Sequence, residues 1–276
     1  MKIGIALSGG GMRGIAHAGV LQALKENNIS IDIIGGTSAG SMIATLYALG
    51  YEPKEILQLF QKYAKKIAGN SKISFVNSII KRNGQGLRDG KELEDIYNDI
   101  ANKKGIKKIN EIKMPLVIPC VDILDNNEYI FTNYVPLENE HHYITDIEIG
   151  KAVRASSSFP AVFNPCNMKQ HFFMDGGAVD NVPVKEVRKQ GADKVIAVKF
   201  ESDPINEKSN MIDIVMKTID IMGNKIAEEG LKTSDCILNI GTDKMGLLDT
   251  DKLENCFNQG YQTTISNLDK IYNVIK

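Results

Sequence analysis

The sequence IIGGTSAGSMI, residues 33–43, decides the fold. Its first part completes an apolar run, Ile29–Ile34, that is typical of a buried strand and ends in two glycines. Its second part opens a helical pattern, Ala39–Leu49, that stops at Gly50. A strand that turns tightly into a helix is a building unit of parallel sheets. The stretch therefore predicts an α/β protein.

The flanking sequence continues this alternation. Lys2–Leu7 predicts a strand, and Ala16–Asn28 predicts a helix that ends in an asparagine cap. Further strands are predicted at 116–123, 128–132, 172–174, 194–200 and 236–240, and further helices from Pro53 onward and at 147–155 (capped by Asp146), 184–190, 211–227 and 252–275. No repeat or low-complexity linker divides the chain. We therefore expect one domain over residues 1–276, with a motif-bearing core over about 1–200 and a helical part over about 201–276.

The composition excludes several classes of protein. The chain has 276 residues, of which 43% are hydrophobic and 24% charged, as in ordinary globular proteins and unlike disordered, collagenous or coiled-coil chains. Its net charge of −1 provides no overall basic field for nucleic acid. The four cysteines contain no CxxC pair, which argues against a zinc cluster or a disulfide framework and favours a reducing compartment.

Two stretches bear on localisation. The apolar run at residues 3–7 is too short for a signal peptide, and the uncharged run at 33–51 contains four glycines, so a strand, turn and helix explain it better than a membrane span. We expect a cytoplasmic protein, with peripheral membrane contact as an option. Residues 61–113 hold thirteen Lys/Arg against six Asp/Glu, which predicts either a solvated helical insertion or a surface for anionic lipid.

A glycine-rich loop follows the first predicted strand. Gly9, Gly11 and Gly14 have the spacing of a dinucleotide-binding fingerprint. Glycines before a helix let backbone N–H groups surround an anion, which can be a stable pyrophosphate or a transient oxyanion. An oxidoreductase would need an acidic residue at the end of the second strand. Asp32 is the only acid there, and two apolar residues and a glycine turn follow it.

The motif GxSxG spans Gly36 to Gly40 and places Ser38 between a strand and a helix, which is the context of a nucleophile elbow. The alternative is a serine that only caps the helix. A serine nucleophile needs a base. The histidines are His17, His141, His142 and His171, with none in the 105 residues that follow, so a Ser-His-Asp triad is poorly supported.

Asp175 is the candidate base. It ends the apolar run at 172–174 and precedes Gly176 and Gly177. Partial burial would raise the pKa of this carboxyl and make it a better proton acceptor near neutral pH. An aspartate that only caps the glycine turn is the alternative. The absence of a histidine partner for Ser38 favours the catalytic interpretation.

Taken together, these motifs resemble the patatin-like phospholipase family. GGGxRG at Gly9–Gly14, GxSxG at Gly36–Gly40 and DGG at Asp175–Gly177 occur in the family's order, and looser matches lie at 155–165 and 87–90. The resemblance covers about residues 1–200. It implies a three-layer α/β/α sandwich around a mostly parallel sheet, and hydrolysis of lipid acyl esters by a Ser-Asp dyad without a metal or other cofactor.

Carried over to this chain, the resemblance implies that Ser38 is the nucleophile and Asp175 the general base. The oxyanion hole would be the loop made of Gly9, Gly10, Gly11, Met12, Arg13 and Gly14, with Arg13 anchoring the loop or meeting a substrate phosphate. The acyl chain would lie along Ile15, Met42, Ile43 and Leu46, unless these are simply core.

Other functions stay open at this stage. They are a dinucleotide-binding oxidoreductase, a catalytically silent lipid-binding protein, and an acyltransferase or thioesterase that uses the same acyl-enzyme. The predicted helix at 211–227 either packs on the sheet or lies at a lipid interface. The lipid head group, the acyl-chain length and the oligomeric state are not determined by the sequence.

Overall fold

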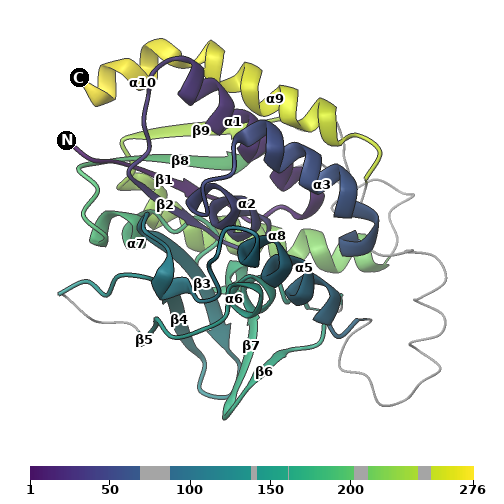
Figure 1. Ribbon diagram of the computed structural model, residues 1–276. Helices are drawn as coiled ribbons and strands as arrows, with labels where there is room; N and C mark the ends of the chain where they lie inside the picture. The colour runs from purple at the N-terminus through teal and green to yellow at the C-terminus, as the bar shows by residue number, and fades with distance from the viewer. Residues whose placement is uncertain (69–87, 138–141, 161, 202–210, 242–249) are drawn as a thin grey trace.

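A computed structural model describes residues 1–68, 88–137, 142–160, 162–201, 211–241 and 250–276. Leu87, His141 and Ala161, which belong to stretches considered above, lie outside these described residues. The described part forms a sheet with helices on both faces (Figure 1).

The described strands form one mixed sheet that is mostly parallel at its centre. They are β1 (Ile3–Leu7), β2 (Ile33–Gly36), β3 (Leu116–Asp122), β4 (Asn127–Thr132), β5 (His142–Ile144), β6 (Cys166–Met168), β7 (His171–Asp175), β8 (Lys194–Phe200) and β9 (Cys236–Ile240). The order is β5-β4-β3-β2-β1-β8-β9, and every pair from β3 to β9 is parallel. β4 and β7 run antiparallel to β3, and β6 pairs with β7.

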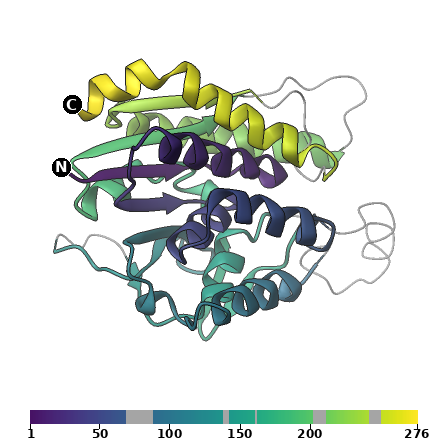
Figure 2. The ribbon, with the colours of Figure 1, turned by 45° about the horizontal axis from the view of Figure 1, so that its top comes forward.

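The helices form the two outer layers. They are α1 (Ile15–Glu26), α2 (Ala39–Ala48), α3 (Pro53–Ala68), α5 (Lys91–Asn102), α6 (Ile149–Ser156), α7 (Val184–Lys189), α8 (Met211–Lys232), α9 (Leu253–Ser266) and α10 (Leu268–Ile275). Three short 3-10 turns lie in connections between a strand and a helix: η1 (Gly11–Gly14), η2 (Ile109–Glu111) and η3 (Gly176–Ala178). In Figures 1 and 2, α1 lies between α9 and α3 on one face of the sheet.

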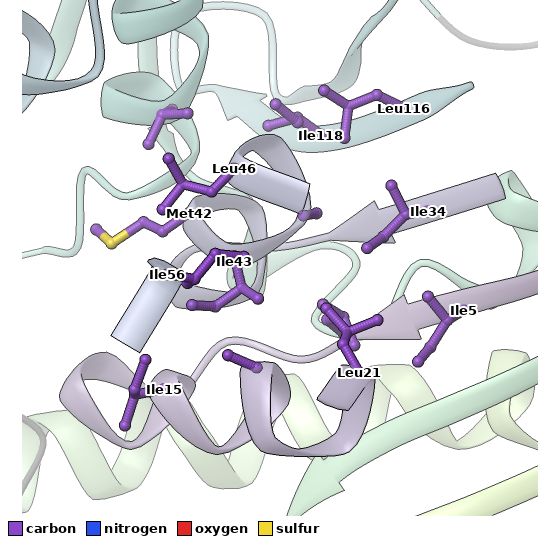
Figure 3. Packing of buried hydrophobic residues seen from close by; sticks show 14 of the residues in the cluster. Ile5, Ile15, Leu21, Ile34, Met42, Ile43, Leu46, Ile56, Leu116 and Ile118 are labelled. Carbon is purple, nitrogen blue, oxygen red and sulfur yellow. The ribbon is translucent and has the colours of Figure 1, made fainter. Parts of the chain in front are cut away.

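Side chains that point alternately to the two faces of the sheet form two separate hydrophobic cores. Successive strand residues point to opposite faces, so Ile5 and Leu7 join the larger core with α1, α2, α3, α5, α6, α9 and α10, whereas Ala6 joins a smaller core. The smaller core contains Val187 of α7 and Leu231 of α8. Figure 3 shows part of the larger core, in which strand and helix side chains form one cluster. The three-layer sandwich expected from the family resemblance is confirmed.

Two glycines bring α1 and α9 into backbone contact. A Cβ at Gly260 of α9 would overlap the carbonyl group of Ala16, and a Cβ at Gly19 of α1 would overlap the carbonyl group of Phe257. The C-terminal helical part is therefore packed directly on the first helix of the chain.

This contact leads to a stability prediction. Alanine is normally the better helix former by about 1 kcal/mol, but overlap in a packed interior typically costs about 1–3 kcal/mol. Gly260→Ala should therefore lower the free energy of unfolding, measured by chemical denaturation. Gly230→Ala in α8 is the matched control, because a Cβ added at Gly230 would lie 3.8 Å from its nearest described neighbour. This substitution should leave the free energy of unfolding unchanged or raise it. Equal stability of the two variants would contradict the proposed close contact.

Several predicted boundaries need correction. The strand expected from Ile29 begins at Ile33, because Ile29 donates its N–H to the carbonyl of Leu24 and so belongs to the cap of α1, with Asn28 in the left-handed region (φ 59°). The helix expected over 252–275 is two helices. Asn267 interrupts it because its side-chain amide donates to the Thr263 carbonyl at 2.8 Å.

The predicted cap of α6 was wrong. Glu148 precedes the helix and makes no side-chain cap, whereas Asp146 forms an ion pair with Lys108 at 2.6 Å. In the basic segment, the described part includes α5, in which Glu92 pairs with Arg88, a residue that precedes the helix, and Lys91 pairs with two acidic residues. Residues 69–87 of this segment lie outside the described part, and both interpretations of the segment stay predictions. No helix in the described part combines the length and hydropathy needed to cross a bilayer.

Candidate active site

The sheet brings the ends of β2 and β7 together along one edge of β3. β2 pairs with the start of β3, where Gly35 lies opposite Val117, and β7 pairs with its end, where Asp175 lies opposite Cys120. The strands approach from opposite directions, and Val117 and Cys120 are about 10 Å apart along β3. Ser38, which follows β2, and Asp175, the last residue of β7, are thus placed at the same point of the sheet.

Ser38 stands on a strained turn. Its φ of 52° and ψ of −121° are uncommon for a residue with a side chain, and such a conformation persists only where its surroundings hold it. The Ser38 N–H donates to Ser156 Oγ at 3.1 Å, the Thr37 hydroxyl donates to the Asp180 carbonyl at 2.7 Å, and the Thr37 N–H donates to the Leu7 carbonyl. These bonds hold the turn from both sides.

The glycines around Ser38 are required by space. A Cβ at Gly36 would overlap the backbone of Gly40, and a Cβ at Gly40 would overlap the Leu7 carbonyl. The third motif shows the same constraint, because a Cβ at Gly176 would overlap the Pro119 carbonyl. The tight turns that carry Ser38 and Asp175 therefore require a residue without a side chain at Gly36, Gly40 and Gly176.

The glycine loop has anchored and open positions. The Gly9 N–H already donates to Asn181 Oδ1 at 3.1 Å, and Arg13 Nε donates to the Gly10 carbonyl at 3.2 Å. These two hydrogen bonds hold the loop in place. Gly14 packs on Ala39, which would lie 2.6 Å from an added Cβ. The first N–H groups of a helical turn have no partner within it. At η1 these belong to Gly11 and Met12.

One cavity of about 90 Å³ is lined by both Ser38 and Asp175. Its lining consists of Gly9, Gly10, Gly11, Met12, Ser38, Ala39, Met42, Ser157, Phe159, Val162, Phe163, Asp175, Gly177, Asn181, Ile219 and Asp220. Arg13 and Gly14 are not among these residues. Of the four residues expected along an acyl chain, Met42 lines the cavity, whereas Ile15, Ile43 and Leu46 are fully buried core.

Asp175 is a buried carboxyl, 4% exposed. Its Oδ1 accepts the Gly177 N–H at 2.8 Å, which is the glycine-turn cap considered as the alternative role. Burial raises the pKa of Asp175 to about 6, and the nearby Ser38 side chain and the hydrogen bond from the Gly177 N–H limit the rise. A carboxyl with this pKa is mostly ionised at neutral pH and can still accept a proton.

None of the three described histidines lines the cavity. His17 is fully buried, its Nε2 lies 2.9 Å from the Ser8 carbonyl oxygen, and burial lowers its pKa to about 4, so its ring is neutral. His171 pairs with Asp122 at 2.6 Å, and His142 stacks on Tyr129. This arrangement agrees with the poor support for a Ser-His-Asp triad.

The position of Asp32 does not suit a dinucleotide site. The ribose contact belongs at the carboxyl end of the second strand, whereas Asp32 precedes β2 and its Oδ2 accepts the Ile3 N–H at 2.8 Å. The only acid considered for that role therefore lies at the opposite end of the strand.

Sequence reasoning missed part of the cavity wall. Ile219 and Asp220 come from α8, which packs on the turn after Asp175, since a Cβ at Gly223 would lie 2.7 Å from the Gly177 carbonyl. Ser156, Ser157 and Asn181 were also unassigned, although the two serines lie in a stretch that matched the family.

α8 packs on the sheet and also exposes apolar side chains, and its role at a lipid interface stays a prediction. Ala227 and Leu231 are buried against the sheet, whereas four apolar side chains are 44–57% exposed: Ile214, Ile221, Met222 and Ile226.

Comparisons with known proteins identify the family of this chain. The model of the patatin-like phospholipase family matches residues 5–188. Lysophospholipase NTE1 of Candida albicans is 32% identical over 205 residues, covering 72% of this chain and 13% of that protein. Lysophospholipase NTE1 of Saccharomyces cerevisiae is 31% identical over 201 residues, covering 72% and 11%. This chain thus spans only a small fraction of these relatives' length.

Solved structures share the fold. VipD from Legionella pneumophila superposes with a TM-score of 0.57 at 17% identity, over 97% of this chain and 66% of VipD. Human GIVD cytosolic phospholipase A2 in complex with methyl γ-linolenyl fluorophosphonate gives 0.50 at 9% identity, over 99% and 58%. The match of the family model to residues 5–188, together with relatives more than 30% identical, shows that this chain belongs to the patatin-like phospholipase family.

Proposed function

We propose that this protein is a lipid acyl hydrolase in which Ser38 is the nucleophile and Asp175 the general base. The observation that carries the proposal is the shared cavity: a serine on a strained turn, a buried carboxyl with raised pKa, and a glycine loop all line it. A catalytically silent lipid-binding protein could have the same arrangement of residues, but no feature of the described site favours that alternative.

The proposed reaction has two steps. Asp175 accepts the Ser38 proton as Oγ attacks the ester carbonyl, and the alcohol leaves with a proton returned by Asp175. Water then attacks the acyl-enzyme as Asp175 takes a proton from it, the bond between the acyl carbon and Ser38 Oγ breaks, and Asp175 returns the proton to Ser38 Oγ as the fatty acid is released. The N–H groups of Gly10, Gly11 and Met12 are proposed to stabilise the oxyanion, where losing one donor typically costs about 10²–10³ in rate. The bonded Gly9 N–H is left out of this role.

The proposed substrate class is a single-chain lipid ester. The relatives are named lysophospholipases, and apolar side chains such as Met42, Phe159, Val162 and Ile219 line the cavity. We expect the enzyme to meet its substrate by transient contact with a lipid surface, because α8 exposes apolar side chains beside Ile219 and Asp220. A cytoplasmic location remains an expectation.

The direct test is product analysis. The protein is incubated with 1-palmitoyl lysophosphatidylcholine, and released palmitate is measured by mass spectrometry. We expect palmitate release without added metal or nucleotide. Binding of NADH, measured by fluorescence, together with no release from this or other acyl esters, would overturn the proposal and favour an oxidoreductase. Lipid binding with no hydrolysis would favour the silent protein.

The pKa of Asp175 leads to a pH prediction. The base acts in its ionised form, and burial raises its pKa from 3.8 to about 6. The logarithm of kcat/KM for p-nitrophenyl laurate should therefore rise with a slope of one below pH about 6 and level off above pH about 7. Asp180, whose pKa burial raises to about 7, is the control. An Asp180→Asn variant should keep the inflection near pH 6. A flat profile from pH 5 to 7 in folded protein would contradict this assignment.

A further inference from the structure

Ser157 carries a hydroxyl group that the proposed reaction leaves unused. Ser157 lines the cavity together with Ser38 and Asp175, and it is only 3% exposed. Its Oγ is buried and makes no hydrogen bond within the described part of the chain. Buried hydroxyls in folded proteins are nearly always hydrogen-bonded. This atom is therefore suited to a partner that enters the cavity.

The two neighbouring serines differ from Ser157 in this respect. Ser156 Oγ accepts the N–H of Ser38 at 3.1 Å, and Ser158 Oγ donates to the Arg154 carbonyl at 2.8 Å. Both hydroxyls are engaged inside the protein. Of the three consecutive serines, only Ser157 combines a place in the cavity lining with an unengaged hydroxyl.

The backbone places Ser157 beside the base. The Asp175 N–H donates to the Ser158 carbonyl at 3.1 Å, and the Ser157 N–H donates to the Val153 carbonyl at 3.0 Å at the end of α6. Ser157 is thus held next to β7, whereas the glycine loop comes from the other side of Ser38, after β1. In the proposed reaction, the carbonyl oxygen of the ester faces the loop, and the oxygen that leaves faces Asp175, which returns a proton to it.

We infer that Ser157 Oγ donates a hydrogen bond to the leaving ester oxygen. This inference rests on the proposed function. As the bond between the acyl carbon and this oxygen breaks, its electron pair goes to the oxygen, the proton comes from Asp175, and Ser157 keeps its own proton. Ser157 also contacts the attacking water in the second step, because that water occupies the same position.

The test compares two esters of one acyl chain. p-Nitrophenolate is a stable anion that leaves with little help, whereas the alkoxide of glycerol needs stabilisation. Ser157→Ala should therefore lower kcat/KM for monolauroylglycerol about 10- to 100-fold and for p-nitrophenyl laurate less than about 3-fold. A residue that only supports the fold would affect both esters alike. Ser158→Ala is the matched control, and any loss it causes should be equal for the two esters.

The outcomes separate this inference from the proposed function. If the unsubstituted protein hydrolyses both esters and Ser38→Ala hydrolyses neither, the proposed function stands. An equal loss for both esters in Ser157→Ala, or no loss for either, then overturns the role of Ser157. The melting temperature is a second readout. It should not fall in Ser157→Ala because no protein partner is lost, and a large fall would assign Ser157 to structure instead.

Discussion

Replacing Ser38 with alanine is expected to lower kcat for a lysophospholipid or a p-nitrophenyl ester by about 10⁴-fold or more. The substitution removes the only atom proposed to bond to the acyl carbon, whereas Ser157 is proposed to keep its proton and to donate a hydrogen bond only. The turn should persist, because the bonds that hold it come from the Ser38 backbone and from Thr37. Alanine at the same φ of 52° keeps the strain without the hydroxyl.

Covalent labelling makes this prediction specific. A fluorophosphonate should form a single adduct that peptide mapping assigns to Ser38, and the Ser38→Ala variant should form none. Ser234→Ala is the control, because the Ser234 hydroxyl donates to the Leu231 carbonyl at the end of α8 and does not line the cavity. An adduct on another serine, or full activity in Ser38→Ala, would reject Ser38 as the nucleophile.

Replacing Asp175 with asparagine is expected to lower kcat by about 10⁴-fold, as in serine hydrolases whose supporting carboxylate is converted to an amide. The amide can still accept the Gly177 N–H but cannot take the Ser38 proton. Activity should be lost at every pH. Turnover near that of the unsubstituted protein would contradict the Ser-Asp dyad.

The folding stability of Asp175→Asn should not fall with its activity, and is expected to stay equal or rise. A carboxyl whose pKa is raised on folding, here from 3.8 to about 6, destabilises the folded state once it is ionised. The difference corresponds to about 3 kcal/mol. That cost is absent below pH about 4, grows as pH rises toward 6, and is complete above it. Asp175→Asn should therefore match or exceed the stability of the unsubstituted protein at pH 8.

Asp122→Asn is the matched control for both measurements. Asp122 is another buried aspartate, the last residue of β3, and it accepts the Phe172 N–H and contacts His171. It does not line the cavity. Its substitution should leave most of the activity and lower the stability, which is the reverse of the pattern expected for Asp175.

The central fold could be predicted because its signals are local. A short apolar strand that runs into glycines and then a helical pattern specifies a parallel unit, and β8 and β9 were predicted with the bounds that the structure has. Gly36, Gly40 and Gly176 are required by backbone contacts close to their own turns, so short motifs reveal them.

The features that could not be predicted depend mostly on contacts between residues that are distant in sequence. The bond from Gly9 to Asn181 joins residues 172 positions apart, and no pattern around Gly9 indicates that its N–H is engaged. α8 was predicted as a helix, but its place beside the cavity depends on Gly223 meeting Gly177. The role of Ile29 in the cap of α1 could not be separated from a strand, because an apolar run has the same appearance in both.

The residues proposed to react and the part of the cavity wall formed by α8 come from different regions of the chain. The groups proposed to react, from the glycine loop to Asp175, lie within the stretch that the family model matches, whereas Ile219 and Asp220 lie beyond it. Substitutions in α8 can therefore change the shape of the cavity while the residues proposed to react stay the same.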